Sequence, residues 1–320
     1  MRQPTASICR ALSLAVAGVV AACSAGAPLG SVDLTAQPSV RATAAASATP
    51  EPAEIESLTL APPTPSPTPA PAATPNWNEL PVPATDAAGL AKQLAMVEAA
   101  IRDPNVTGAQ LAWMGHLQQL AYGTLADYPD WKESVLAALP EKTRSAVLSS
   151  IDAGKQLRSM HGAVPKTLPD WKIVEPAPID ELVGYYKEAE EAFGVSWYYL
   201  AAIHLVETRM GRIRGLSSAG AQGPMQFMPP TWAAYGKGDV NKNHDAIIAA
   251  ARYLKAAGAP GNMQKALFAY NHAQAYVNAL MAYAEAMKTD PATYRGYHGW
   301  QVYYPTPDGP VLLPVGWRKG

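Results

Sequence analysis

The sequence predicts a mainly α-helical protein with a small β-hairpin near its C-terminus and a disordered tether near its N-terminus. Apolar residues recur at helical spacing from about residue 86, and a turn signal between alternating apolar residues follows residue 300. Residues 24–84 are rich in Ala, Pro, Thr and Ser, a composition that does not build a packed core. The 320 residues suffice for one or two packed domains. With 25 basic and 26 acidic residues there is no basic excess, so we expect no nucleic-acid partner.

Residues 1–22 are expected to form a lipoprotein signal peptide. Arg2 and Arg10 accompany an apolar stretch, residues 11–20, that is too short to span a membrane. The sequence Val-Ala-Ala-Cys ending at Cys23 resembles a bacterial lipobox, in which the cysteine is lipidated and becomes the new N-terminus. We therefore expect an extracytoplasmic protein anchored to the cell membrane through Cys23. The alternative is an ordinary signal peptide followed by a chance cysteine.

Residues 23–84 are expected to comprise the lipidated cysteine and a disordered tether. The proline-rich run 61–69 lacks the N–H donors of a helix or a sheet and favours polyproline II structure. At ~3 Å per residue, such a tether could reach on the order of 150 Å when stretched. A tail without a reach function is the alternative. Because Cys9 and Cys23 are the only cysteines, cleavage before Cys23 would leave no intramolecular disulfide.

Residues 85–175 are predicted to form a helical region without catalytic chemistry. The expected helices cover residues 86–102, 107–120, 130–139 and 140–161. The first has one apolar face, formed by Leu90, Leu94, Val97 and Ile101. Thr107 and Gln110 have the spacing of a capping box. No chemistry-bearing groups cluster here, so His116 and His161 are expected to be packing or surface residues.

Residues 176–320 are predicted to form a second domain. Its first helix has an apolar stripe that consists of Leu182, Tyr186, Ala189 and Phe193, and Gly194 suits its C-terminal end. Ser196 is expected to cap the next helix, residues 197–210, which Gly211 would end. This helix is apolar nearly all round, so we expect it to be buried.

Glu207 occupies a position in that helix where the pattern calls for an apolar residue. It shares a stripe with Leu200, Ile203 and Met210. Burial and the carbonyl dipoles of a helix C-terminus both favour the neutral form of a carboxyl group and raise its pKa. A carboxylic acid that keeps its proton near neutral pH can protonate a glycosidic oxygen. The alternative is that Glu207 is buried only to pair with an arginine, for which Arg209, Arg212 and Arg214 are available.

The segment 211–230 is predicted to be a long, glycine- and proline-rich loop. Loops of this length are uncommon inside compact domains and are often functional. Gln226 is flanked by the apolar residues Met225, Phe227 and Met228, which is a suitable lining for a sugar cleft. No Asp or Glu occurs between Thr208 and Gly238, so the local sequence offers no second carboxylate of the kind that many glycosidases use. A purely structural loop is the alternative.

Three ordered motifs carry a family resemblance. Residues 202–208 (Ala-Ile-His-Leu-Val-Glu-Thr), 217–229 (Ser-Ser-Ala-Gly-Ala-Gln-Gly-Pro-Met-Gln-Phe-Met-Pro) and 269–272 (Ala-Tyr-Asn-His) resemble those of the lytic murein transglycosylases, the transglycosylase SLT-domain proteins. The resemblance extends over residues 178–288 and implies a lysozyme-like helical fold related to goose-type lysozyme. The Gln-Phe-Met-Pro form is similar to the membrane-bound transglycosylase B branch.

The resemblance implies an enzyme that cleaves the glycan strands of peptidoglycan at the cell wall. In this family one glutamate acts as acid and then as base, and the 6-hydroxyl of N-acetylmuramic acid attacks C1 to give a 1,6-anhydro product. Glu207 matches the catalytic glutamate, and the matching substrate-binding positions are Ser217, Gln226, Tyr253, Tyr270 and Asn271. We expect no cofactor.

Alternatives remain for the residues and for the function. Tyr253 and Tyr270 lie on helical stripes and could be core residues, Asn271 could simply end a helix, and Ser217 could stabilise the loop. A hydrolytic muramidase would use the same glutamate. A non-catalytic peptidoglycan-binding lipoprotein is a further alternative from a different class.

Two remaining patterns are assigned structural roles. Residues 239–245 resemble the start of an EF-hand loop but lack its glycine, where His244 stands, and its final glutamate, where Ala250 stands, so we expect no metal. Asp245 is predicted to be the N-cap of a helix that runs to Ala256. A hairpin is predicted around the turn 307–309, with its aromatic residues facing the core.

Overall fold

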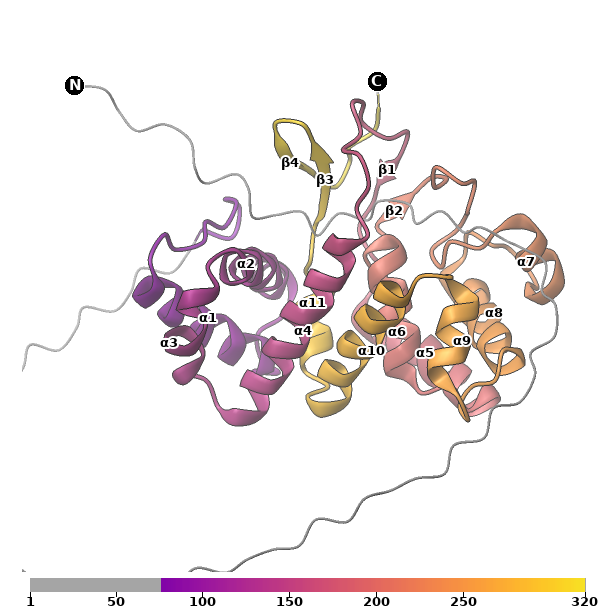
Figure 1. The fold of residues 1–320 in the computed structure, drawn as a ribbon, viewed down its shortest axis with the longest axis horizontal. Coiled ribbons are helices and arrows are strands. Elements are labelled where there is room, and N and C mark those ends of the chain that lie inside the picture. Colours follow the sequence, from indigo (N-terminus) through magenta and orange to yellow (C-terminus); the bar gives the residue numbers. More distant parts are fainter. Residues whose placement is uncertain (1–75, 320) are drawn as a thin grey trace, which may run out of the picture. The chain divides into compact units, whose positions relative to one another are not determined.

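The computed structural model describes residues 76–319 (Figure 1). The predicted signal peptide, the lipidation site Cys23 and most of the predicted tether therefore lie outside the described residues. The helices are α1 (Ala87–Arg102), α2 (Gly108–Asp127), the 3₁₀ turn η1 (Pro129–Trp131), α3 (Lys132–Ala137), α4 (Glu141–Ser159), α5 (Ile179–Phe193), α6 (Trp197–Thr208), α7 (Pro229–Tyr235), α8 (Asn243–Ala256), α9 (Met263–Tyr270), α10 (Gln274–Thr289) and α11 (Thr293–His298). The predicted mainly helical fold is confirmed.

Helices α1 to α4 arise largely where the apolar periodicity places them. The predicted stripe on α1 is fully buried, and the Asp86 side chain caps the helix by accepting a hydrogen bond from the Gly89 N–H at 2.9 Å. The capping box at Thr107 is wrong, because Thr107 occupies the N-cap position without a side-chain capping bond. The helix predicted over 130–139 is replaced by η1 and the short α3, since the proline at position 129 starts a tighter turn.

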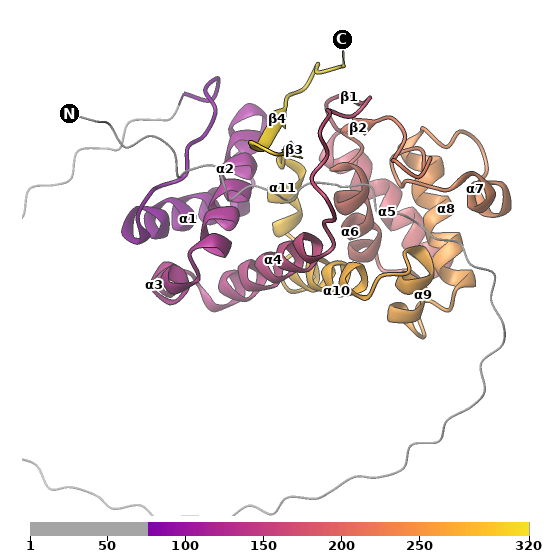
Figure 2. The same ribbon diagram turned by 45° about the horizontal axis from the view of Figure 1, so that its top comes forward.

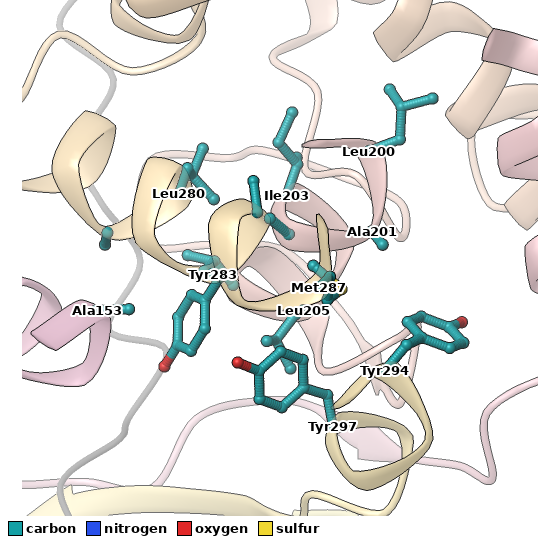
Figure 3. Close-up of a cluster of buried hydrophobic side chains, with 14 of the residues drawn as sticks. Ala153, Leu200, Ala201, Ile203, Leu205, Leu280, Tyr283, Met287, Tyr294 and Tyr297 are labelled. Atoms are coloured by element: carbon teal, nitrogen blue, oxygen red, sulfur yellow. The ribbon is translucent and has the colours of Figure 1, made fainter. Parts of the chain in front are cut away.

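Helices α5 and α6 supply the centre of the core. Gly194 ends α5 in the left-handed conformation, with φ of 72°, as predicted. From Leu200 to Thr208 every side chain of α6 except that of Glu207 is buried. Figure 3 shows apolar residues of α6 packed against the aromatic and aliphatic side chains of α10 and α11. Helix α6 ends at Thr208 rather than at Met210, because Arg209, Met210 and Gly211 all adopt positive φ (54°, 60° and 78°) and turn the chain sharply.

The hydrophobic core is continuous across the predicted domain boundary at residues 175 and 176. One cluster of buried side chains contains Leu90 and Val147 from the first region together with Leu205 and Tyr283 from the second. Helix α4 runs along α10, as both ribbon views show (Figures 1 and 2). Residues 77–319 accordingly belong to one compact unit, and both predicted regions contribute residues to the cleft described below.

Two short antiparallel strand pairs complete the fold. The predicted C-terminal hairpin is confirmed as β3 (Val302–Thr306) and β4 (Gly309–Leu313), with Thr306 opposite Gly309. Strand β1 (Lys172–Ile173) pairs with β2 (Ile213–Arg214). This second pair was not predicted, since two-residue strands have no periodicity to read. Among the helices of the described region, none has the length and apolar character needed to cross a bilayer.

The predicted capping role of Asp245 is wrong. Helix α8 begins at Asn243 with Lys242 at its N-cap, so Asp245 lies inside the first turn. Its carboxylate instead accepts a hydrogen bond from the backbone N–H of Asp239 at 2.9 Å. A carboxylate in the first turn still interacts favourably with the helix dipole, and it fixes the loop that precedes the helix.

Candidate active site

A cleft of about 970 Å³ opens beside the C-terminal end of α6. Five of the six predicted site residues line this cleft: Glu207, Ser217, Gln226, Tyr270 and Asn271. They come from the last turn of α6, from the loop between β2 and α7, and from the C-terminal end of α9. Folding therefore brings together residues that are separated by more than sixty positions in the chain.

Glu207 lines the cleft with a carboxyl group whose pKa is raised, so it retains its proton at higher pH than an ordinary glutamate. Its side chain is partly exposed where it lines the cleft. Burial of its carboxyl group raises the pKa of Glu207 from 4.5 to about 7, and a hydrogen bond from Tyr276 opposes this rise. The Tyr276 hydroxyl donates to Oε1 of Glu207 over 2.5 Å. Near neutral pH the residue can thus both give and accept a proton.

The arginines that follow Glu207 have other partners. Arg212 binds Glu175 and the backbone carbonyl of His298, and Arg214 donates to the carbonyl of Asn241. Arg209 donates to the carbonyl of Leu205, and its guanidinium group lies over the Trp300 ring. Among the described residues, no arginine contributes to the pKa shift of Glu207. The geometry therefore disfavours the alternative in which Glu207 is buried only as an ion-pair partner.

The loop after β2 is fastened to the end of α6. The Thr208 hydroxyl donates to the carbonyl of Pro224 at 2.5 Å and accepts from the Gly211 N–H at 3.1 Å. Gly223 has φ of 75°, and a Cβ at this position would collide with the backbone carbonyl of Val240. Only glycine tolerates both the positive φ and the close approach of the Val240 carbonyl. The bonds hold the loop against the helix that carries Glu207.

Gln226 and Ser217 enter the cleft from this loop. Gln226 adopts φ of 49°, which is costly for a residue with a side chain, and such strain tends to occur at functional sites. Its side-chain amide nitrogen donates to the carbonyl of Gly223 at 3.0 Å. The Ser217 hydroxyl accepts from the N–H groups of Ala219 and Ala221. Ser217 therefore lines the cleft and also stabilises the loop, so both roles weighed from the sequence are compatible with its geometry.

The end of α9 supplies Tyr270 and Asn271. The Tyr270 hydroxyl donates to the carbonyl of Met225 at 2.7 Å, and Asn271 is the C-cap residue of α9. Tyr253 lies behind this pair and does not line the cleft. Its hydroxyl donates to the carbonyl of Ala269 at 2.6 Å, and its ring centroid lies 5.7 Å from that of Tyr270. The position of Tyr253 supports Tyr270 from behind.

Two parts of the site were not predicted from the sequence: a residue that contacts Glu207 from behind the cleft lining, and one wall of the cleft. Tyr276 lies on the buried face of α10, where a tyrosine on an apolar stripe resembles an ordinary core residue. The second part is the wall formed by the end of α4, the chain leading to β1 and the hairpin residues Tyr304 and Pro305. His161, expected to be a packing or surface residue, belongs to this wall. No motif marks these segments.

No group of three or more His, Cys, Asp or Glu side chains within residues 76–319 is arranged to hold a metal ion. In the loop 239–245 the carboxylates are engaged locally. Asp239 accepts from the backbone N–H of Asn241, and Asp245 accepts from that of Asp239. Glu188 and Asp245 both contact the imidazole of His244.

A part of this chain matches the model of a known protein family. Residues 184–292 match the family model of the transglycosylase SLT domain, and Glu207, Tyr276 and all five predicted substrate-binding residues lie inside the match. The resemblance inferred from the three motifs is thereby confirmed.

A curated relative agrees with this class. The chain is 28% identical over 153 residues to the membrane-bound lytic murein transglycosylase F of Thiobacillus denitrificans, an alignment that covers 45% of this chain and 32% of the relative. The chain thus spans about a third of the length of that relative. No solved structure matches the chain. Because the relative is named for another branch, similarity to the B branch stays a prediction.

Proposed function

We propose that this protein is a lytic transglycosylase that cleaves the β-1,4 bond between N-acetylmuramic acid and N-acetylglucosamine in peptidoglycan, with Glu207 as its catalytic residue. One observation carries the proposal: Glu207 lines an open cleft, and burial raises its pKa to about 7. The SLT domain and the murein transglycosylase relative support the class of reaction and substrate.

In the first step, protonated Glu207 donates its proton to the glycosidic oxygen. The bond between this oxygen and C1 of the muramic acid residue breaks, and N-acetylglucosamine leaves with a hydroxyl group. The positive charge that develops at the muramic acid is stabilised by the acetamido group of the substrate itself. The raised pKa of Glu207 makes the protonated form available near neutral pH.

In the second step, the Glu207 carboxylate removes the proton of the muramic acid 6-hydroxyl. The oxygen O6 then bonds to C1, which gives the 1,6-anhydro ring and returns Glu207 to its protonated state. The hydrogen bond from Tyr276 stabilises the carboxylate between the two steps. Burial and the neighbouring Glu207 raise the pKa of Tyr276 well above its usual value, so its hydroxyl keeps the proton that it donates.

One residue suffices because no water has to be activated. The other carboxylate that lines the cleft is Asp170, which is exposed and belongs to the chain before β1. Gln226 and Asn271 line the same cleft as Glu207, and amide groups are suited to binding the hydroxyl and acetamido groups of the sugars.

Mass spectrometry of digested peptidoglycan tests the proposal. The wild-type protein should release fragments with 1,6-anhydromuramic ends, and Glu207→Gln should release none. Fragments with reducing ends would instead identify the hydrolytic muramidase, which the same cleft could support. If the wild type cleaves nothing while Glu207→Gln still binds murein, the protein binds peptidoglycan without cleaving it.

We also propose that the protein acts outside the cytoplasm, held at the cell membrane by a lipid on Cys23 and facing the cell wall. The name of the curated relative, a membrane-bound enzyme, supports a location at a membrane. In this arrangement residues 23–84 act as the tether, 85–175 as a helical region and 176–320 as the catalytic domain. The hydrophobic core is continuous across residue 175, so the described residues of the last two parts pack together as one compact unit.

A further inference from the structure

We infer that one wall of the cleft is a saccharide-binding surface, which extends the substrate site beyond the SLT domain. This wall consists of Tyr304 and the cleft-lining residues of segment 157–171, which include Ala163 but not Val164. This inference rests on the proposed function. The wall and Glu207 line the same cleft, whereas the SLT match covers only residues 184–292. A part of the substrate site would therefore lie outside the SLT match, in the helical N-terminal region and in the C-terminal hairpin.

The wall is attached to the loop that carries Ser217. The indole N–H of Trp171 donates to the carbonyl of Leu216 at 3.0 Å, directly before Ser217 in the chain. Strand pairing places Lys172 opposite Arg214. A Cβ on Gly215 would lie 2.7 Å from the Trp171 ring and 2.9 Å from the carbonyl of Asp170, so the two segments touch at backbone distance. The end of the wall at Asp170 and Trp171 is therefore fastened to the loop that carries Ser217.

The hairpin holds the other side of the wall in place. The rings of Trp171 and Tyr304 meet edge to face with their centroids 5.5 Å apart. Both belong to a separate hydrophobic cluster that also contains Ile173, Ile213, Val302 and Leu313. Such a cluster fixes the aromatic residues before any ligand binds, which lowers the entropic cost of binding.

The chemistry of the wall favours sugar over peptide. Most of its cleft-lining residues are apolar or aromatic, chiefly Met160, Ala163, Pro165, Pro169, Trp171 and Tyr304. Its polar side chains are those of His161 and Asp170. Apolar and aromatic surfaces pack against the C–H faces of pyranose rings and the methyl groups of acetamido substituents. An acidic stem peptide would instead require accessible cations. Of the arginines and lysines, the cleft lining contains only Arg209, which is 2% exposed and donates to the carbonyl of Leu205.

Two neighbouring residues provide a matched test. Ala163 lines the cleft, whereas Val164 is exposed and lies outside the cleft lining. Both lie in the irregular segment after α4, so a larger side chain at either position leaves the helices intact. The variants Ala163→Trp and Val164→Trp are assayed with intact peptidoglycan and with glycan strands freed of their stem peptides by an amidase.

Ala163→Trp should lower kcat/KM at least about tenfold on both substrates and to the same extent, while Val164→Trp should stay near wild type. A loss by Ala163→Trp that is confined to peptide-bearing substrate would overturn the inference in favour of a stem-peptide site. Wild-type activity of Ala163→Trp, or equal loss of activity in both variants, would overturn it as well. In either case the loss of activity would not depend on whether the substituted residue lines the cleft.

A binding measurement separates this inference from the proposed function. Calorimetry with a β-1,4-linked N-acetylglucosamine tetramer uses the Glu207→Gln background, in which no cleavage occurs. The additional change Ala163→Trp should weaken binding about tenfold and Val164→Trp should not. This result would support saccharide binding by the wall even if the wild type proved inactive on murein. Unchanged binding would refute the binding role of the wall, while the catalytic role proposed for Glu207 would remain.

Discussion

Glu207 should destabilise the folded protein at alkaline pH, and replacing it by glutamine should relieve this cost. Burial raises its pKa from 4.5 to about 7, so the folded state holds a proton that the unfolded state has already released over this pH range. Unfolding then becomes easier as the pH rises. Each pKa unit corresponds to about 1.4 kcal/mol, which makes the loss of stability about 3 kcal/mol by pH 8.

The Glu207→Gln variant isolates this effect. Glutamine has nearly the same shape, carries no charge and can still accept the hydrogen bond from Tyr276. Below pH 4.5 the Glu207 carboxyl group is mostly protonated in both the folded and the unfolded state, and glutamine is always neutral, so the free energies of unfolding should be similar. Above pH 7 the variant should be more stable than the wild type by about 3 kcal/mol.

Urea unfolding followed by circular dichroism between pH 4 and pH 8 measures the difference. The control is Glu191→Gln, which changes an exposed carboxylate on α5 and should show no such pH-dependent gain. A difference between Glu207→Gln and wild type that is constant over the pH range would refute the reasoning. A wild type that is more stable at pH 8 would refute it too, because the carboxylate would then be stabilised by the fold.

Three further changes test other parts of the account. Tyr276→Phe removes a donor that favours ionised Glu207, and such bonds contribute roughly 1.5–3 kcal/mol, so the basic limb of the pH–rate profile should move up by about one to two pH units. A downward shift would contradict this role. Gly115→Ala should destabilise the protein by about 1–3 kcal/mol in urea unfolding, because the new Cβ meets the backbone of Gly296 and lies 2.8 Å from the Cα of Gly299. Gly184→Ala on α5, with open space around it, should be neutral or stabilising, and equal behaviour of the two would argue against the packing explanation. Cys23→Ala should release the protein from the membrane fraction, and unchanged fractionation would exclude the lipid anchor.

The fold could be predicted where local signals and tertiary packing agree. The stripe on α1, the left-handed glycine after α5 and the hairpin turn each follow from one physical rule, and each is found in the structure. Predictions failed where a side chain had a choice of partners. Asp245 was expected to cap α8, yet it binds the backbone N–H of Asp239 from within the first turn.

The end of α6 shows how a tertiary contact overrides a local rule. Gly211 has the properties of a helix stop, but the chain leaves the helix after Thr208. The Thr208 hydroxyl binds both the carbonyl of Pro224 and the N–H of Gly211, which requires the chain to turn at once. The residues responsible are sixteen positions apart, so no local pattern contains this information.

The residues of the site that belong to sequence motifs could be predicted, whereas the residues that surround them could not. Glu207 stood out because it interrupts an apolar stripe, and the loop around Gln226 because of its length and composition. Tyr276 contacts Glu207 from 69 positions away and looks like a core residue on its own helix. The wall around Ala163 consists of irregular chain whose place beside the cleft depends on how α4 packs against α10.

The catalytic role proposed for Glu207 depends most directly on the ionisation of its carboxyl group. A ¹³C NMR titration of glutamate carboxyl groups, with Glu207→Gln used to assign the signal, measures that ionisation in the intact protein. The account predicts a midpoint near pH 7, because burial raises the pKa of Glu207 to about 7. A midpoint near 4.5 would show that the carboxyl group is ionised at neutral pH and cannot serve as the proton donor.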